Sequence, residues 1–534
     1  MNRFLSGLTQ NRTKVGVIHE LPIGKNNVFS YILYNSSLLQ TSFLSLLLVF
    51  LFPSLGKCQD IPNQQDLPKV NSELQLLLNK PNQDIPLKLI DAVYLALQNN
   101  RDLKIAYLQR ILDKQQLAET ESQFNPTFGT QLSWDFNNNE TGSNSSTNKN
   151  AALGANFKLK LPTGTNLSLR WQGRNQVFNN SSFSSYSSTD ILNQGLNLSL
   201  SQPLLRGFGT YLNTLNIKRA RLTENTNILF FKNTISQTIT NTILVYRNLL
   251  LAQERLKIEE LSFANAKKEL EQLEALFAEG KITKSDLVER QADLAQKEVN
   301  LVNVQTNLIQ AISDLTKITD LPLKMLIAAE KPAPPTSLDL PTFEEMLKLA
   351  QDNNTSYLIA INSVENAKFT IAEAKDQQRL DLRLNVNYGF NSASNSDDTN
   401  SVTSSLVLSR EFGNLSQDNA VYKSEIALQK ANYNLAKTQD DLNEELRNKI
   451  RNAKDSFKQI ELARLALNLA ELRLNNAKEK MKSDSNTSMT DIINFERGLV
   501  DAQNQELNAV INHLNSMTQL EQFLGITLNK WIKQ

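Results

Sequence analysis

Apolar and polar residues alternate along two parts of the chain, residues 127–202 and 382–410. From Leu153 to Leu161, every second residue is apolar, and Gly, Asn and Lys stand between them. A period of two is typical of strands with one buried face, so both parts predict β-strands. We expect a hairpin over 152–172. We expect polar loops at the Asn/Ser/Thr-rich stretches 137–150, 173–193 and 391–401.

Two long stretches, residues 211–279 and 418–482, are instead predicted to form helices. A helix over 211–279 spans about 100 Å, which is longer than an ordinary globular core and requires partners along its whole length. Shorter helices are expected before each stretch and again after it. Their predicted ranges are about 87–100, 101–124 and 283–318 in the first half, and 342–354, 357–380 and 488–524 in the second.

The helix predicted over 283–318 has two neighbouring apolar stripes. A seven-residue repeat indicates left-handed coiled-coil packing, and two stripes indicate neighbours on two sides, as in a helical wall or tube. One stripe is Leu287, Leu294, Leu301, Leu308 and Leu315, and the other is Val288, Ala295, Val302 and Ile309.

The order of these elements occurs twice, which indicates a tandem duplication. The opening "LKLIDAVYLALQNN" is echoed by "TFEEMLKLAQDNN", and the spacing from Gly209 to Gly280 is 71 residues where that from Gly413 to Ser485 is 72. The first copy carries about 50 more residues before its long helix, by comparison of these repeats. We assign the copies to 87–320 (strands 127–202, helical hairpin 211–318) and 342–528 (strands 382–410, helical hairpin 418–524), with a proline-rich linker at 321–341 and a tail at 529–534.

A tight turn is predicted at the end of the first long helix. Gly280 can adopt the positive φ of a helix C-cap. Thr283 or Ser285 can then cap the next helix, and Asp286 in its first turn suits the helix dipole. Ser485 stands where the second copy would have the glycine, so that turn requires other residues.

The N-terminal region contains an uncharged apolar run of eleven residues at 42–52. It is too short for a membrane-spanning helix and suits the core of a secretory signal peptide. We therefore expect an exported protein with a signal peptide region at 1–58 and a linker at 59–86. Whether Cys58 is lipidated stays open at this stage.

The composition argues against several kinds of binding and catalytic site. The net charge is +1, which gives no electrostatic reason to expect nucleic acid. With one cysteine and two histidines, the chain can form no intrachain disulfide, and a His-based catalytic triad or a multi-histidine metal site is not expected. No nucleophile–base pair or phosphate loop stands out. We expect neither an enzyme nor a cofactor or metal site.

The segments "LSQPLLRGFG" and "AEGKITKSDLVERQADL", together with the opening helix and its duplication, resemble the TolC-type outer-membrane efflux proteins over residues 87–528. The resemblance implies an α+β fold of mainly long helices. In it, a trimeric transmembrane β-barrel in the outer membrane continues into a periplasmic α-helical coiled-coil barrel. The family contributes four strands per protomer, so the hairpin 152–172 is extra and would either enlarge the barrel or form an added module. Leu380 also replaces the proline expected before the first strand of the second copy.

The same resemblance implies a function and partners. It implies the exit duct of a tripartite efflux pump or type I secretion system, which carries drugs, small molecules or proteins outward. The expected partners are two further copies of the chain, a periplasmic adaptor (membrane fusion) protein, an inner-membrane pump of the RND, ABC or MFS type, and outer-membrane lipid. The alternative from the residues alone is a coiled-coil surface or structural protein without a channel.

Candidate site residues follow from the family's pattern. A periplasmic constriction would be lined by Asp491 and Asn494 and by their counterparts Asp286 and Glu289; rings of such acids select cations and can bind a divalent ion. In the alternative reading, Asp286 and Asp491 are only helix N-terminal residues. We interpret the charges of 254–275 as a solvated helix face, and His513, in the slot of Leu308, as a packed or pore-side residue. The expected adaptor-docking tips are Gly280, Lys281, Thr283, Lys284, Ser485 and Thr487.

Overall fold

The computed structural model describes residues 85–142, 144–182, 185–320, 327–329, 335–394, 396–483 and 488–532. The chain divides into the units 1–63 and 64–534, and all described residues belong to the second. The predicted signal peptide and Cys58 lie outside the described residues, as do tip residues Ser485 and Thr487.

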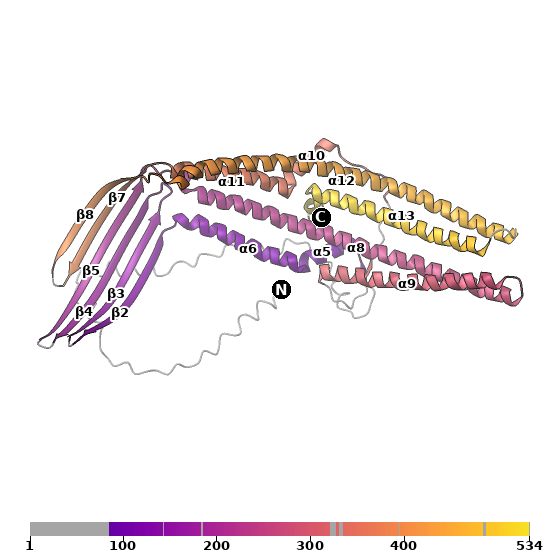
Figure 1. The fold of residues 1–534 in the computed structure, drawn as a ribbon, viewed down its shortest axis with the longest axis horizontal. Coiled ribbons are helices and arrows are strands. Elements are labelled where there is room, and N and C mark those ends of the chain that lie inside the picture. The colour runs from indigo at the N-terminus through magenta and orange to yellow at the C-terminus, as the bar shows by residue number, and fades with distance from the viewer. Residues whose placement is uncertain are drawn as a thin grey trace. The chain divides into compact units, whose positions relative to one another are not determined.

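One six-stranded antiparallel sheet joins the two halves of the chain (Figure 1). The first half supplies four strands and the second supplies two, and β5 pairs with β7 where the halves meet. The hairpin expected over 152–172 is present as β3–β4, and it lies inside the sheet instead of forming a separate module. In sheet order the strands are β2 (Thr127–Thr141), β3 (Asn144–Lys160), β4 (Asn166–Ser182), β5 (Ser185–Pro203), β7 (Asp381–Ala393) and β8 (Ser396–Ser409).

The prediction of long polar loops is wrong. Most of the three Asn/Ser/Thr-rich stretches is strand: Asn137 pairs with Asn148, Asn175 with Leu192, and Asn391 with Thr399. A ladder is built from backbone hydrogen bonds, which any residue other than proline can complete. Polar side chains therefore lengthen these hairpins without breaking them.

The register gives the sheet two different faces. Residues directly opposite each other in an antiparallel pair lie on the same face. Leu132 of β2 lies opposite Leu153 of β3, Leu153 opposite Gly173 of β4, and Gly173 opposite Gln194 of β5. One face of the sheet therefore holds the even-numbered residues of β2 and β5 and the odd-numbered residues of β3 and β4. This apolar face continues onto β7 and β8 and includes Phe128, Leu132, Trp134, Leu153, Phe157, Leu169, Trp171, Leu196, Leu198, Val386, Tyr388, Val402 and Leu406.

Two long helical hairpins extend away from the sheet (Figure 1). Helices α8 (Leu215–Ala278) and α12 (Leu415–Ser483) have 64 and 69 residues, and each is followed by a returning helix, α9 (Lys284–Thr319) or α13 (Met489–Phe523). The lengths agree with the sequence prediction. No helix among the described residues combines the length and apolar character needed to cross a membrane.

Shorter helices occupy equivalent places in both halves. In each half, an asparagine ends the first short helix and caps the second, because the side chains of Asn100 and Asn354 accept hydrogen bonds from the backbone N–H groups of Leu103 and Tyr357. The first pair is α5 (Leu89–Asn99) and α6 (Arg101–Glu121), and the second is α10 (Phe343–Asn353) and α11 (Thr355–Gln377). The remaining elements are β1 (Ile85–Leu87), paired in parallel with β6 (Ile327–Ala329), the 3₁₀ turn Ser122–Phe124, α7 (Thr210–Asn213) and α14 (Thr527–Ile532).

Two clusters of the apolar core lie within one half each, and another joins the halves where Leu273 packs against Met489 and Ile493. Leu249, Leu315 and Tyr246 form one cluster beside α5. Met346 of α10 packs with Leu446 and Leu520 in a corresponding cluster. In each half a short helix packs against the long hairpin, and near the tips the two hairpins pack directly against each other.

Candidate functional site

The tip of the first hairpin turns at Gly280. Its φ is 72°, its N–H donates to Phe277 O at 2.9 Å, and the N–H of Lys281 donates to Leu276 O at 2.9 Å. These two bonds form a Schellman motif, which satisfies the last carbonyls of α8 and confirms the predicted C-cap. The ammonium of Lys281 pairs with Glu279 at 2.6 Å and is exposed.

Both returning helices begin with the same capping box. Asp286 N donates to Thr283 Oγ1 at 3.2 Å, and Thr283 N donates to Asp286 Oδ2 at 3.1 Å. Ser488 and Asp491 repeat this arrangement, with both bonds at 3.1 Å. Of the two caps considered for α9, the structure therefore selects Thr283. Its partner Asp286 and the equivalent Asp491 each complete a helix N-terminus.

The capping bonds also set the charge of Asp491. Hydrogen bonds from the Ser488 hydroxyl and backbone N–H hold the pKa of the Asp491 carboxyl below its usual range. Asp491 is therefore an anion at neutral pH, which is the state that a cation-binding ring requires.

The other two predicted constriction residues lie together, one turn further along. Glu289 of α9 and Asn494 of α13 line a groove of about 720 Å³ between the two hairpins. The Thr490 hydroxyl donates to Glu289 Oε2 at 2.6 Å, which links the two returning helices directly. The structure thus divides the four candidates: two carboxylates serve in capping boxes, and Glu289 and Asn494 line the groove.

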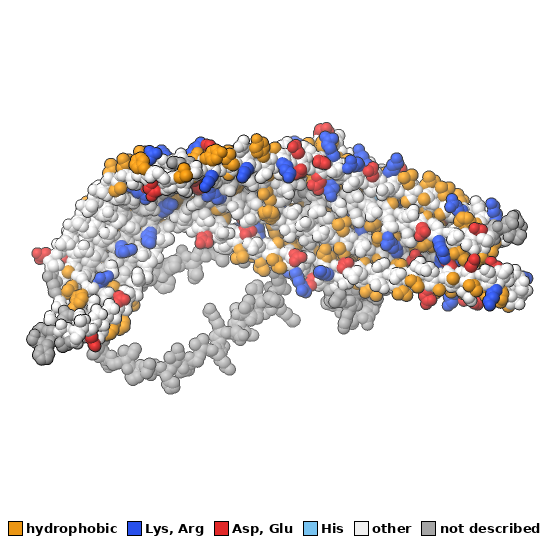
Figure 2. All heavy atoms as spheres, viewed as in Figure 1, with side chains coloured by type: hydrophobic (Ala, Val, Ile, Leu, Met, Phe, Trp, Pro, Cys, Tyr) orange, Lys and Arg blue, Asp and Glu red, His pale blue; other side chains and the backbone are white. Residues whose placement is uncertain are grey.

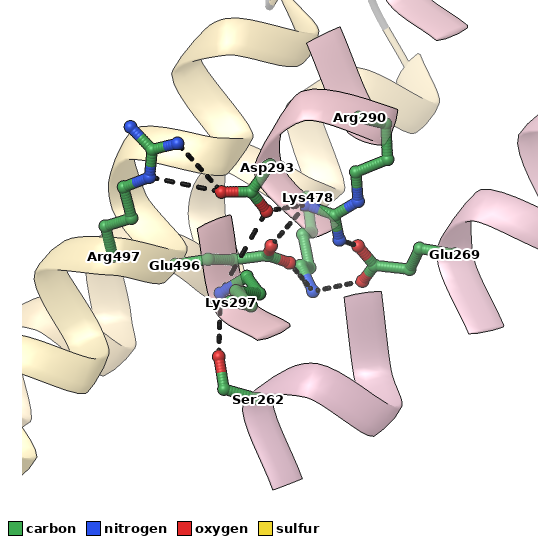
Figure 3. Close-up of polar contacts among 8 residues, drawn as sticks. All are labelled: Ser262, Glu269, Arg290, Asp293, Lys297, Lys478, Glu496 and Arg497. Atoms are coloured by element: carbon green, nitrogen blue, oxygen red, sulfur yellow. Dashed lines mark hydrogen bonds and ion pairs between the residues drawn. The ribbon is translucent and has the colours of Figure 1, made fainter. Parts of the chain in front are cut away.

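Beside this groove lies a charge network that sequence reasoning missed (Figure 3). Its centre is Arg290 of α9, whose side chain has no exposed surface. The guanidinium contacts Glu269 of α8, Asp293 of α9 at 3.2 Å and Glu496 of α13 at 2.9 Å. Lys478 of α12 bridges Glu269 and Glu496 at 3.0 and 2.9 Å. Four helices, two from each hairpin, therefore meet in one network.

Further contacts complete the network. Arg497 Nη2 lies 2.9 Å from Asp293 Oδ1, and Lys297 Nζ donates to the Ser262 hydroxyl at 2.7 Å. Burial works to raise the pKa of Glu496, but the bonds and charges of Lys478 and Arg290 outweigh it and keep that pKa below its ordinary value. The carboxylate stays ionised inside the junction.

The interpretation of 254–275 as a solvated face holds for most of its charged residues, which are exposed, but not for Glu259 and Glu269. Glu269 bridges the hairpins, and Glu259 is only 8% exposed, so that burial raises the pKa of its carboxyl. The sequence did contain a pattern that could have revealed this. Arg290 and Lys297 stand three residues after the seam positions Leu287 and Leu294, where later heptads have Val304 and Ala311. Charges at such seam positions indicate a buried polar junction.

His513 is a packed residue of the α12–α13 seam. It is 3% exposed, its Nδ1 lies 3.0 Å from the Ser456 hydroxyl, and its ring packs edge-on against Phe457. Burial lowers the pKa of the imidazole, so it is neutral at pH 7. Within the described ranges, no group of three or more His, Cys, Asp or Glu residues is arranged to hold a metal ion.

Comparison with solved structures shows which fold this is. Over 82% of this chain, the structure superposes on the Campylobacter jejuni outer membrane channel CmeC, with a TM-score of 0.62, 16% identity and 85% of that chain covered. The Vibrio cholerae outer membrane protein VceC superposes with a TM-score of 0.61 and 14% identity, over 82% of this chain and 96% of VceC. The open-state Neisseria gonorrhoeae outer membrane channel MtrE superposes with a TM-score of 0.59 and 14% identity, over 82% of this chain and 88% of MtrE. No protein-family model matches the sequence, and neither does any curated protein. The chain therefore shares the fold of outer-membrane channels.

Proposed function

We propose that three copies of this chain form an outer-membrane channel, the exit duct of a tripartite efflux pump or type I secretion system. One observation carries the proposal: a six-stranded sheet with one apolar and one polar face is continuous with helical hairpins about 100 Å long. On β2 the apolar positions run from Phe128 to Phe136. A band of about nine residues matches one crossing of a bilayer.

The two edges of the sheet support closure by further copies. Strands β2 and β8 each pair on one side only in the described sheet. Their apolar side chains are strongly exposed, with Leu132 at 79% and Val402 at 74%. In a membrane, unpaired backbone groups at such edges must find partners, and closure into a barrel provides them. Three copies would give eighteen antiparallel strands, six from each.

The helices also have faces for neighbouring copies. On α9 the second apolar stripe is exposed, with Val302 at 55% and Ile309 at 68%. On α12 Leu465 and Leu472 are exposed at 55% and 57%. Contiguous apolar stripes of this kind mark protein contacts. Packing α9 of one copy against α12 of the next would cover both stripes and form the wall of a periplasmic tube.

The tips of the helical hairpins are the proposed sites of the constriction and of adaptor docking. Asp491, Asn494, Asp286 and Glu289 would line a periplasmic constriction as rings of three. Exposed residues at the first tip, Lys281, Thr283 and Lys284, would dock a periplasmic adaptor, together with Ser485 and Thr487 of the second tip. An inner-membrane pump, of the RND, ABC or MFS type, would supply the energy through that adaptor.

Purification tests the proposal directly. The protein, extracted from outer membranes in detergent, is imaged as single particles and reconstituted in planar bilayers. We expect a three-fold hollow cylinder at least about 100 Å long that conducts ions. A monomeric or solid rod-shaped particle without conductance would refute the proposal and favour a coiled-coil structural protein.

A further inference from the structure

The β3–β4 hairpin has an unusual charge. Between Asn144 and Ser182 there are five basic residues and no Asp or Glu. The second copy of the repeat has no counterpart to this hairpin, since it supplies only β7 and β8. The basic residues are Lys149, Lys158, Lys160, Arg170 and Arg174.

The register places four of these five on the polar face of the sheet. Lys158 lies opposite Ser168, and Arg170 lies opposite Asn156 and Asn197, all of which are polar-face positions. Lys160 and Arg174 are also even-numbered residues of β3 and β4 and therefore lie on the polar face. Lys149 is the exception, because it lies opposite Phe136 and Val177 on the other face. We call Lys158, Lys160, Arg170 and Arg174 the basic arc.

The basic arc is not neutralised by the described part of the chain. No ion pair joins any of its four side chains to a described acid, and Lys158 and Arg170 are exposed. The acids of the same face are engaged or distant. Asp381 is held by Arg206 at 2.5 Å and Arg383 at 2.8 Å. Asp135 accepts a hydrogen bond from Asn150 at 3.1 Å.

One acid lies close to the arc. Asp397 lines a surface groove together with Arg174, Gln172 and Asn391. It offsets part of the charge at that end of the arc only. Figure 2 shows basic side chains on the sheet, most of whose visible surface is neither hydrophobic nor charged. The hairpin therefore adds cationic charge to a face that is otherwise close to neutral.

We propose that the basic arc makes the membrane section of the pore anion-selective, and that it guides anionic cargo such as organic carboxylates, sulfates or phosphates outward. This rests on the proposed channel function, in which the polar face lines the lumen. Three copies would place twelve cationic side chains around it. Charges of one sign on a lumen with low-dielectric walls raise the local concentration of counter-ions. Six strands per copy also leave room for them, because barrels of 16–18 strands enclose an aqueous channel.

The test is the ratio of chloride to potassium permeability, measured from reversal potentials of reconstituted channels in a KCl gradient. Changing all four arc residues to Gln should lower the ratio by about two- to threefold, because the counter-ion enrichment is lost. Lys158→Gln alone should lower it partly. Lys149→Gln is the matched control: it removes the same charge from the same strand, on the opposite face, and should leave the ratio unchanged. The effect should weaken at high salt, as screening predicts.

The outcomes separate the two proposals. If the unaltered protein forms no channel, the proposed function fails and the arc fails with it. If channels form but the fourfold Gln variant keeps the original permeability ratio, the arc proposal alone is overturned. Equal shifts from Lys158→Gln and Lys149→Gln would also overturn it, because the effect would then not depend on the face.

Discussion

Arg290 carries a charge without any exposed surface, and it contacts carboxylates on three helices. Replacing it with Met would leave Glu269, Asp293 and Glu496 close together with less compensation. Removing one partner of a buried charge cluster costs about 3–5 kcal/mol. We expect Arg290→Met to lower the free energy of local opening near residues 290–297 by about that amount, as measured by native-state hydrogen exchange.

A surface pair provides the control for Arg290. Arg221 and Glu121 form an ion pair at 2.8 Å with side chains 65% and 39% exposed. Exposed pairs contribute about 0–1 kcal/mol, so Arg221→Gln should change little. Equal losses in the two variants would contradict a special role for the buried junction.

Asp491 has two compatible roles, the capping box that the structure shows and the constriction that we propose. Asp491→Ala removes the charge from the proposed ring, so we expect higher single-channel conductance or a weaker response to divalent cations in planar bilayers. Ser488→Ala removes the hydroxyl that caps α13 and keeps the Asp491 carboxylate, so it controls for the loss of a cap. If Asp491→Ala conducts as the unaltered channel does, or if Ser488→Ala changes conductance equally, Asp491 is a capping residue only.

For individual residues, the sequence predicted the roles in turns and caps well, but it predicted the contacts between distant residues poorly. Gly280, Thr283 and Asp286 act within a few residues of one another, so their arrangement follows from turn and capping rules. The partners of Arg290 come from positions as far away as Glu496. No local rule brings such residues together, because their meeting depends on how two hairpins pack.

At the scale of elements, the turn at Gly280 tests whether a positive φ alone requires glycine at the helix end. A Cβ at Gly280 would meet no atom within 4 Å, so any cost of Gly280→Ala comes from the positive φ. That cost is about 1–2 kcal/mol for an L-residue, and hydrogen exchange at the first tip should report it. Gly498 inside α13 is also surrounded by open space but has no positive φ. Gly498→Ala should therefore stabilise its helix by about 0.5–1 kcal/mol, opposite in sign. Destabilisation by both variants would contradict this explanation.

The α12–α13 seam should respond to pH through His513. Burial lowers the pKa of its imidazole below the ordinary value of 6.5. The unfolded chain then binds a proton at a higher pH than the folded chain does. Stability is complete above about pH 6.5 and declines as pH falls below it, until the folded imidazole also titrates. Thermal unfolding at pH 7.5 and 5 should show the decline.

His513→Leu supplies the matched variant, because Leu308 occupies the equivalent slot of the first copy. We expect it to keep the seam packed and to reduce the difference between the two pH values. An undiminished difference would assign the pH dependence to other groups.

The elements themselves were largely predictable. The long helices, their returning partners and the hairpin over 152–172 follow from periodicity, which is a property of neighbouring residues. The extent of the strands was not predictable in this way. Asn and Ser side chains favour turns locally, yet residues such as Asn137 and Asn175 are held in the sheet by partners on adjacent strands.

For the whole molecule, the free edges β2 and β8 make the sharpest prediction. If copies close a barrel, cysteines on the apolar-face positions of β2 (128–136) and β8 (402–408) should form disulfides between copies at one register, because the Cα atoms of the correct pair come within about 6 Å. With Cys58 replaced by Ser, oxidation should give covalent trimers on denaturing gels.

Cysteines at Trp171 and Leu196 are the control, since β4 and β5 pair these residues within one copy. They should form only intramolecular bonds. Trimers from the control, or none from any β2–β8 pair, would argue against closure through these edges.

The sequence by itself determined the repeating order of elements, the alternation that gives the sheet two faces, and the capping of each helix, because each of these depends on residues close together in the chain. Only the tertiary structure decided that the β3–β4 hairpin belongs to the main sheet, that β5 pairs with β7, and that Arg290 joins the two hairpins. These are contacts between residues far apart in sequence. Their energies come from strand pairing, burial and charge compensation across the fold, which no local pattern specifies.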